Sequence, residues 1–207
     1  MSGARWRVLI LAFDGVEALD FAGPFEVFTT ATRMHQRLQP DAAPLFEVAA
    51  VGAVTPDKPV ATARAGLRLL PDHGLADSPQ ADVLIVPGGV VDQPMASAET
   101  LQWIAAQAAS AAITASVCTG AFLLAASGVL TDQRVTTHWE DIADLRQAFP
   151  ALDVDDGVRW VDNGKVVTSA GISAGIDMSL HLVARLAGEA LAERTARQMD
   201  FTWTRNP

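Results

Sequence analysis

The sequence predicts an α/β fold in which helices cover both faces of a mostly parallel, doubly wound sheet. Short β-rich runs alternate along the chain with longer segments of helical composition. Several of the short runs are apolar throughout, as is typical of strands buried on both faces. Repeated β–α–β order favours parallel strands joined by helices. The chain has 207 residues, of which 50% are hydrophobic, so one core is expected and residues 1–207 are predicted to form a single domain.

The expected elements follow this alternation. Strands are predicted at 7–13, 46–51, 82–86, 113–117 and 135–137. Helices are predicted at 21–38, 98–111, 119–126, 139–149, 172–186 and 190–201. Gly188 is expected to separate the last two. A β-hairpin is predicted near 159–168, because Asn163-Gly164 lies between two β-rich runs and suits a tight turn with positive φ.

Composition excludes several classes of function. The formal net charge of −9, from 24 acidic and 15 basic side chains, repels phosphate backbones, so no nucleic-acid partner is expected. A single cysteine allows no internal disulfide and suits a reducing compartment. It forms no metal-binding pattern with the four histidines, so no metal site is expected. No apolar run approaches about 18 residues, so we expect a cytoplasmic protein that does not associate with membranes.

Cys118 is the main candidate for a catalytic residue. The segment 112–128 is typical of a strand, a sharp turn at Cys118 and a helix that Gly128 ends. Unpaired N–H groups at a helix start favour the thiolate and can lower a cysteine pKa from about 8.5 to between about 3.5 and 7.5. Gly120 lets the backbone of the turn approach its neighbours closely. The alternative is that Cys118 is a small buried apolar residue.

Gly88 and Gly89 form a second candidate, since they follow Pro87 directly after the strand predicted at 82–86. Their N–H groups, together with that of Thr119, can form an oxyanion-type site for negative charge that develops on a substrate attacked by Cys118. The alternative is a simple turn, which most Pro-Gly pairs form.

Asp20 is the third candidate. It precedes the helix that Pro24 is expected to help start, so an N-cap is its simplest role. In the other interpretation its carboxyl group lies in the same crevice as Cys118, holds a proton against the thiolate and passes it to the substrate. The pKa values of the two groups would then be coupled.

These residues lie in motifs that resemble the ThiJ/PfpI superfamily, a branch of the class I glutamine-amidotransferase-like proteins. The resemblance extends from Val8 to about Gly188. Its most specific pieces, in chain order, are LDFAGP at 19–24, PGG at 87–89, SVCTGA at 116–121, TTHW at 136–139 and SAGISAGID at 169–177.

Two branches of the superfamily share this pattern most closely. They are the isocyanide hydratases and the amidase-like sensory half of certain AraC-type transcription regulators. Such regulators continue for about a hundred residues into a basic helix-turn-helix module, whereas this sequence stops at Pro207 with an acidic balance. The hydratase branch is therefore the expected one.

The resemblance implies a flavodoxin-like sandwich, a homodimer, and a cysteine nucleophile beside a carboxylate, by position Cys118 and Asp20. Thr119 is expected to offer a hydroxyl and an N–H near the sulfur. Thr119 stands where the protease-like branch has a histidine that acts as the general base, so the resemblance argues against a peptidase. His138 is expected as a structural or rim residue, with proton transfer as its alternative role. Residues 171–177, which begin with Gly171, are expected to form a wall of the pocket that shifts when the cysteine is modified, because the matching helix start in the family lies near the cysteine.

The resemblance also suggests a reaction on a small-molecule substrate. The Cys118 thiolate attacks the isocyanide carbon, protonated Asp20 supplies a proton to give a thioimidate, and water releases an N-substituted formamide. Gly89 is expected to offer an amide to water or substrate, and no metal or organic cofactor is required. Two alternatives stay open: a non-catalytic small-ligand-binding module related to the regulators, and a deglycase or redox-stress protein, whose members usually carry Glu in place of Asp20.

Overall fold

The computed structural model describes residues 5–55 and 57–205, and their main sheet is mostly parallel, as predicted. The strand order is β10-β11-β7-β6-β1-β2-β5. Neighbouring strands pair in parallel except for β10 and β11, which pair antiparallel. The strands are β1 (Trp6–Ala12), β2 (Phe46–Gly52), β5 (His73–Gly74), β6 (Val83–Val86), β7 (Ile113–Val117), β10 (Trp160–Asp162) and β11 (Val166–Ser169).

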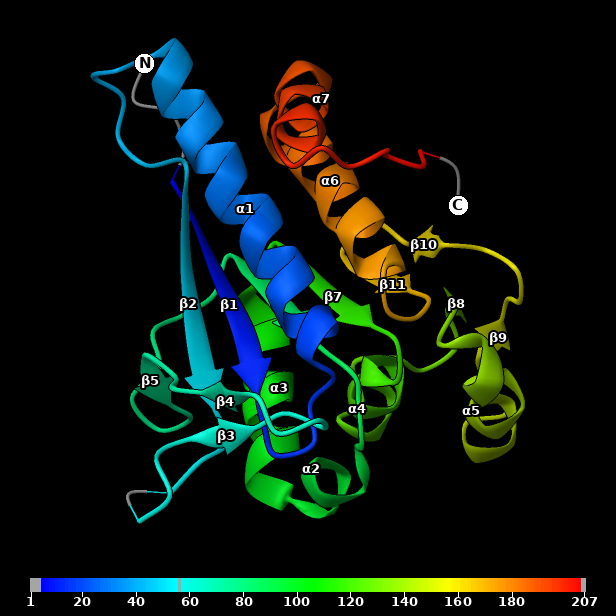
Figure 1. Ribbon diagram of the computed structural model, residues 1–207. Helices are drawn as coiled ribbons and strands as arrows, with labels where there is room; N and C mark the ends of the chain where they lie inside the picture. The colour runs from blue at the N-terminus through cyan, green and yellow to red at the C-terminus, as the bar shows by residue number, and fades with distance from the viewer. Residues whose placement is uncertain (1–4, 56, 206–207) are drawn as a thin grey trace.

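Helices form a layer on each face of this sheet (Figure 1). One layer contains α1 (Ala18–Leu38), α6 (Ala174–Ala187) and α7 (Glu189–Gln198), which pack against one another. The other contains α2 (Asp92–Ala96), α3 (Ala98–Ser110) and α4 (Gly120–Ala126). This arrangement confirms the predicted α/β sandwich.

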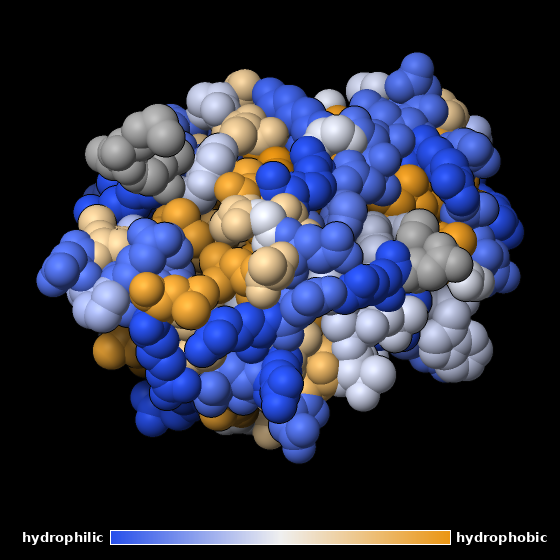
Figure 2. All heavy atoms as spheres, turned by 90° about the horizontal axis from the view of Figure 1, so that it is seen from above, coloured by the Kyte–Doolittle hydropathy of each residue, from blue (hydrophilic) through white to orange (hydrophobic). Residues whose placement is uncertain are grey.

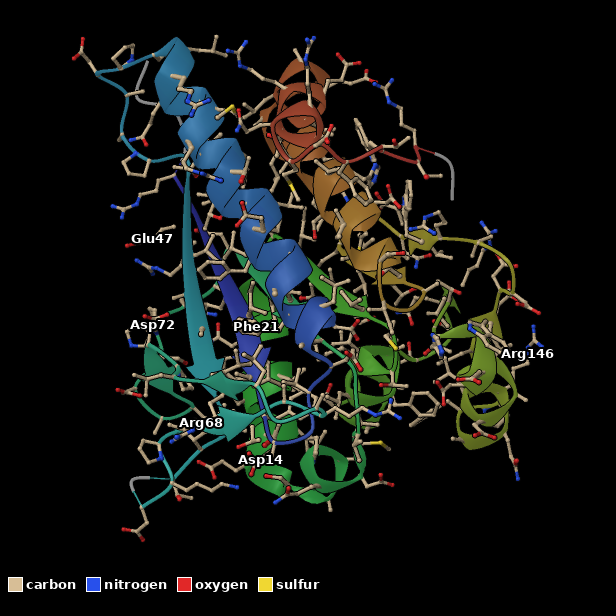
Figure 3. All side chains as sticks on the ribbon, in the orientation of Figure 1. Asp14, Phe21, Glu47, Arg68, Asp72 and Arg146 are labelled. Atoms are coloured by element: carbon tan, nitrogen blue, oxygen red, sulfur yellow. The ribbon has the colours of Figure 1, made fainter. Side chains whose placement is uncertain are left out.

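The core lies at the middle of the sheet. Residues 8–12 of β1 and every residue of β6 and β7 are buried. Burial on both faces explains why residues 8–12 and β6 are apolar throughout, whereas β7 also buries the hydroxyl side chains of Thr114 and Ser116. Because the strands are parallel, their carboxyl ends meet at one edge, where α1 and α4 begin. Figure 3 places Asp14, just after β1, and Phe21, near the start of α1, at this same end.

The predicted hairpin is confirmed. Trp160 pairs with Ser169 across β10 and β11, the N–H of Asn163 donates to the carbonyl of Val166 at 2.9 Å, and Gly164 has a φ of 82°. A residue without Cβ therefore takes the left-handed position that the turn requires.

The region 134–154 differs from the prediction. The expected strand at 135–137 is only β8 (Arg134–Val135), which pairs with β9 (Asp153–Val154) outside the main sheet. The next residue, Thr136, bonds to other partners instead: its N–H donates to Thr168 Oγ1 at 2.9 Å and its hydroxyl to the Asp155 carbonyl at 3.0 Å. The expected helix at 139–149 divides into a 3₁₀ turn (Trp139–Asp141) and α5 (Ile142–Ala148).

The remaining boundaries agree with the sequence to within a few residues, and Gly188, with a φ of 95°, separates α6 from α7. Two short strands, β3 (Ala61–Thr62) and β4 (Arg68–Leu69), form a separate hairpin. The single-domain prediction covers 1–207, of which 1–4, 56 and 206–207 lie outside the described residues. No helix within the described ranges is both long and apolar enough to cross a bilayer. The end of the molecule where α1 finishes is largely hydrophilic, with one main patch of apolar side chains and smaller apolar spots beside it (Figure 2).

Candidate active site

Cys118 lies at a sharp turn between β7 and α4, as predicted. Its φ of 56° is left-handed, a conformation that non-glycine residues rarely adopt outside constrained sites. Gly120 makes the turn possible, because a Cβ there would collide with the backbone carbonyl of Val86 on β6. The N–H of Cys118 donates to the carbonyl of Ser169 at 3.0 Å, which fixes the turn against β11. The geometry supports the nucleophile-elbow interpretation of the sequence.

Asp20 lies inside α1 and is not the helix cap. The helix begins at Ala18 with Glu17 in the N-cap position, and Pro24 lies within the helix rather than at its start. The N-cap interpretation of Asp20 was therefore wrong, because the helix begins before the aspartate and turns the carboxyl group inward. The side chain is fully buried. Its Oδ2 accepts a hydrogen bond from the N–H of Gly88 at 3.2 Å, and its Oδ1 has no hydrogen-bond partner among the described residues.

Burial raises the pKa of Asp20 to about 7, while the Gly88 N–H and the neighbouring Cys118 side chain act in the opposite direction. A carboxyl group with this pKa exchanges protons near neutrality, so it can both take and give a proton during a reaction.

The Cys118 thiol does not have the lowered pKa that its position suggested. Burial raises the pKa to about 12, the negative charge of Asp20 adds to the increase, and the N–H of Thr119 opposes it. Only 6% of the residue is exposed, so the helix start cannot compensate for lost solvation and a nearby carboxylate. The resting form is therefore the thiol, and the thiolate must form by proton transfer within the site.

The Gly88–Gly89 loop is bonded into the site differently from expectation. The Gly88 amide donates to Asp20, as described, and the Gly89 amide donates to Thr119 Oγ1 at 2.8 Å. The Thr119 hydroxyl donates in turn to the Gly89 carbonyl at 2.9 Å. In this structure both glycine amides serve protein side chains instead of an open oxyanion site. Their contribution is to hold the carboxyl group and the residue after the nucleophile in place.

His138 and Gly171 are brought to the same site. Thr137, the residue before His138, donates from Oγ1 to the Cys118 carbonyl at 2.9 Å. The Nε2 of His138 lies 3.3 Å from Glu140 Oε2, and its buried Nδ1 has no hydrogen-bond partner within the described chain. Any Cβ at position 171 would collide with the imidazole ring. Gly171 therefore leaves the space that the histidine occupies.

A cavity of about 300 Å³ opens beside Cys118. Of the residues predicted for the site, Cys118, Thr119, Gly89 and His138 line it. Gly88, Asp20 and Gly171 do not, and they act on it through the contacts above. The other lining residues come from loops, from the start of α2 and from the 3₁₀ turn: Glu17, Arg64, Val90, Asp92, Glu140, Asp141 and Ile172.

Sequence reasoning gave no function to these residues, except for Ile172, which lies in the stretch 171–177 predicted as a pocket wall. Several of them directly follow predicted site residues: Val90 follows Gly89, Ile172 follows Gly171, and Glu140 lies two residues after His138. That adjacency was the available signal. No such signal in the sequence pointed to Arg64, which lies in the β3–β4 hairpin.

The site can be compared with those of known proteins. A sequence profile of the DJ-1/PfpI family matches residues 6–185. A protein named isonitrile hydratase from Pseudomonas putida is 36% identical over 196 residues, which cover 94% of this chain and 78% of that protein. The HTH-type transcriptional regulator GbdR of Pseudomonas aeruginosa is 33% identical over 141 residues, which cover 68% of this chain and 38% of the regulator.

Solved structures agree with the fold. A ThiJ/PfpI family protein from Pseudomonas syringae superposes with a TM-score of 0.81 at 27% identity, covering 97% of this chain and 76% of that one. An AraC family transcriptional regulator from Pseudomonas putida superposes with a TM-score of 0.77 at 22% identity, covering 94% of this chain and 99% of that one. The matched profile, the buried cysteine at its strand-to-helix turn and the shared fold lead to one conclusion: this chain belongs to the DJ-1/PfpI family.

Proposed function

We propose that this protein is an isocyanide hydratase that converts an isocyanide into an N-substituted formamide. The observation that carries the proposal is the pairing of Cys118 with a fully buried carboxyl group, Asp20, whose pKa lies near 7 and whose Oδ1 has no partner among the described residues. The likeness to the Pseudomonas putida isonitrile hydratase supports the same reaction.

The first step uses the two side chains together. Asp20 takes the thiol proton, the sulfur of Cys118 bonds to the terminal isocyanide carbon, and Asp20 returns the proton to that carbon. The product is a thioimidate, R–N=CH–S–Cys118. Isocyanide carbon accepts both the nucleophile and the proton, so one carboxyl group is sufficient for this step.

The second step consumes water. Water adds to the thioimidate carbon, one of its protons goes to the nitrogen, and the carbon–sulfur bond breaks to release R–NH–CHO. The remaining proton returns to the Asp20–Cys118 pair, so the site regains its starting state. Thr119, fixed by Gly89, contributes an N–H directed at the sulfur, which stabilises the thiolate as it leaves.

The direct test is incubation of the protein with a simple alkyl or aryl isocyanide, with formamide measured as the product. We expect turnover by the wild type and none by Cys118→Ala. No turnover by the wild type, or turnover that survives this substitution, would refute the proposal.

A second candidate function is a small-ligand-binding module without catalysis. The identity with GbdR over 68% of this chain favours it, and so does the high pKa of the Cys118 thiol. A metabolite that raises the melting temperature without being converted would support binding over catalysis.

We further propose that the protein acts as a cytoplasmic homodimer on a small-molecule substrate, as the family resemblance implies. Light scattering in solution tests the oligomeric state, since a monomer at assay concentration would exclude the dimer.

A further inference from the structure

The cavity beside Cys118 is acidic. Among its described lining residues, Glu17, Asp92, Glu140 and Asp141 carry carboxyl groups, and Arg64 carries a guanidinium. His138 is the other basic side chain of the lining. At neutral pH the carboxylates outnumber the permanent positive charge, so the cavity has a negative potential that its partly enclosed walls concentrate.

These charges are poorly compensated by the protein. No ion pair among residues 5–55 and 57–205 involves Glu17, Asp92 or Asp141. Burial raises the pKa of Asp141, while His138 and Arg64 lower it without reversing the shift. Carboxylates beside a cavity that form no ion pair within the described chain can pair with a ligand instead.

An aromatic side chain lies next to the same cavity. Trp139 is 70% exposed, and its ring centroid lies 5.7 Å from that of His138, which lines the cavity. Exposed indole rings attract cations through their electron-rich faces. Trp139 therefore adds a second, uncharged element that favours a positive group.

Independent of the acidic lining, the reactive pair itself forms no ion pair with a basic side chain in the described part of the chain. Cys118 lines the cavity while only 6% exposed, and its neighbour Asp20, with a free Oδ1, is fully buried. Negative charge on this pair is destabilised by burial. A cation bound in the cavity would stabilise that charge through space.

We infer that this cavity selects ligands that carry a positive charge, so that the substrate is a small isocyanide with an ammonium group. As a statement about substrates, the inference rests on the proposed hydratase function. The ammonium group would lie among the carboxylates of the cavity lining and Trp139, with the isocyanide carbon at the sulfur. Substrate binding would then favour the thiolate required for attack, so that charge selection and activation of Cys118 are linked.

The first test uses thiol reagents and does not depend on hydratase activity. Cys118 is the single cysteine of the chain, so modification reports on this site alone. Trimethylammonioethyl and sulfonatoethyl methanethiosulfonate differ in the sign of their charge. After each rate is divided by that for a free thiol, we expect the cationic reagent to react at least about tenfold faster. Equal rates, or a faster anionic reagent, would overturn the inference.

Charge variants separate the cavity from the overall acidity of the protein. Asp92→Asn and Glu140→Gln should each reduce the cation preference by about two- to fivefold. The matched control is Asp41→Asn, an exposed residue beyond the far end of α1, about 30 Å from the cavity by the length of that 21-residue helix. It should leave the preference unchanged. A preference that survives both cavity substitutions, or that falls equally with the control, would overturn the inference.

The second test uses substrates. Trimethylammonioethyl isocyanide and its neutral isostere, dimethylbutyl isocyanide, have nearly the same shape. We expect kcat/KM to be at least about tenfold higher for the cation, and Asp92→Asn to reduce that ratio. Hydration of both at equal efficiency would refute charge selection while supporting the hydratase. Hydration of neither, together with a cation preference in the thiol test, would refute the hydratase while leaving the cation site supported.

Discussion

The backbone N–H of Gly88 donates a hydrogen bond to the Asp20 carboxyl group at 3.2 Å, and Asp20 has no other hydrogen-bonded oxygen among the described residues. The Gly88 N–H and the Cys118 side chain together do not replace the hydration that a buried carboxylate loses, which is why the pKa of Asp20 rises to about 7. The consequences can be measured.

Replacing Asp20 with Asn should remove activity and stabilise the protein at high pH. The proton donor is lost, so kcat should fall about 100-fold or more. The folded-state pKa of about 7 lies above the usual 3.8, so the stability associated with Asp20 is full below about pH 4 and is lost as the pH rises through 7. Permanently neutral Asn avoids that loss.

We therefore expect Asp20→Asn to be more stable than the wild type by about 4 kcal/mol at pH 8, and the difference to disappear towards pH 4. Urea unfolding across this range measures it. Asp41→Asn, at an exposed position, should show no such pH dependence. Equal stabilities of Asp20→Asn and wild type at every pH would show that Asp20 is not destabilised by burial.

The reactivity of Cys118 should increase with pH without an early plateau. Its thiol has a pKa raised to about 12, so the fraction of thiolate, and with it the rate of alkylation by iodoacetamide, should still be rising at pH 10. In Asp20→Asn the negative charge that raises this pKa is absent, so the same rates should occur at lower pH. A plateau below about pH 8 in the wild type would contradict the raised pKa.

Gly120→Ala should destabilise the protein much more than Gly128→Ala. A Cβ at position 120 would collide with the backbone carbonyl of Val86, whereas one at position 128 meets nothing within 4 Å. Gly128 has a φ of 77°, so its substitution carries only the strain of a left-handed alanine, about 1 kcal/mol. For Gly120→Ala we expect about 3 kcal/mol or more, measured by urea unfolding. Similar losses of stability in the two variants would mean that β6 moves easily to make room for a Cβ at position 120.

Gly171→Val should disturb His138 and slow the second step of the proposed reaction. The added side chain would occupy the position of the imidazole. The pocket wall that begins at Gly171 would then be displaced, and its movement during hydrolysis of the thioimidate would be impaired. Pre-steady-state measurements of intermediate breakdown would detect this. The matched test compares Gly171→Ala with the double variant Gly171→Ala/His138→Ala. Without the imidazole ring the added Cβ meets no obstacle there, so the double variant should regain the free energy of unfolding that Gly171→Ala loses. Unchanged kinetics in Gly171→Val would exclude the wall from the reaction.

The parts of the site that were predictable from sequence depend on local geometry. A strand, a turn and a helix are specified within 112–128, so the position of Cys118 and the small residue at 120 follow from neighbouring residues. The hairpin at Asn163-Gly164 was predictable for the same reason. For Asp20 the residues alone left two roles open, a helix cap and a carboxyl group in the crevice of Cys118. The usual preference of aspartate for helix starts favoured the cap, and only the family resemblance favoured the position beside the cysteine.

The electrostatics could not be predicted in the same way. The pKa of Cys118 depends on how deeply the fold buries it and on a carboxyl group from a distant helix. The acidic lining combines Glu17 before α1, Asp92 in α2 and Asp141 before α5. These residues share no spacing along the chain, and only the folded arrangement brings their charges to one cavity.

The turn that carries Cys118 is held from three directions: Val86 lies against Gly120, the Ser169 carbonyl accepts from the Cys118 amide, and the Thr137 hydroxyl donates to the Cys118 carbonyl. The backbone of Cys118, held in this way, cannot retreat when a substrate becomes attached to the sulfur. Any movement that makes room for an adduct must then come from the surrounding loops. The flexibility of those loops, and not movement of the nucleophile, therefore determines how large an adduct the protein can accommodate.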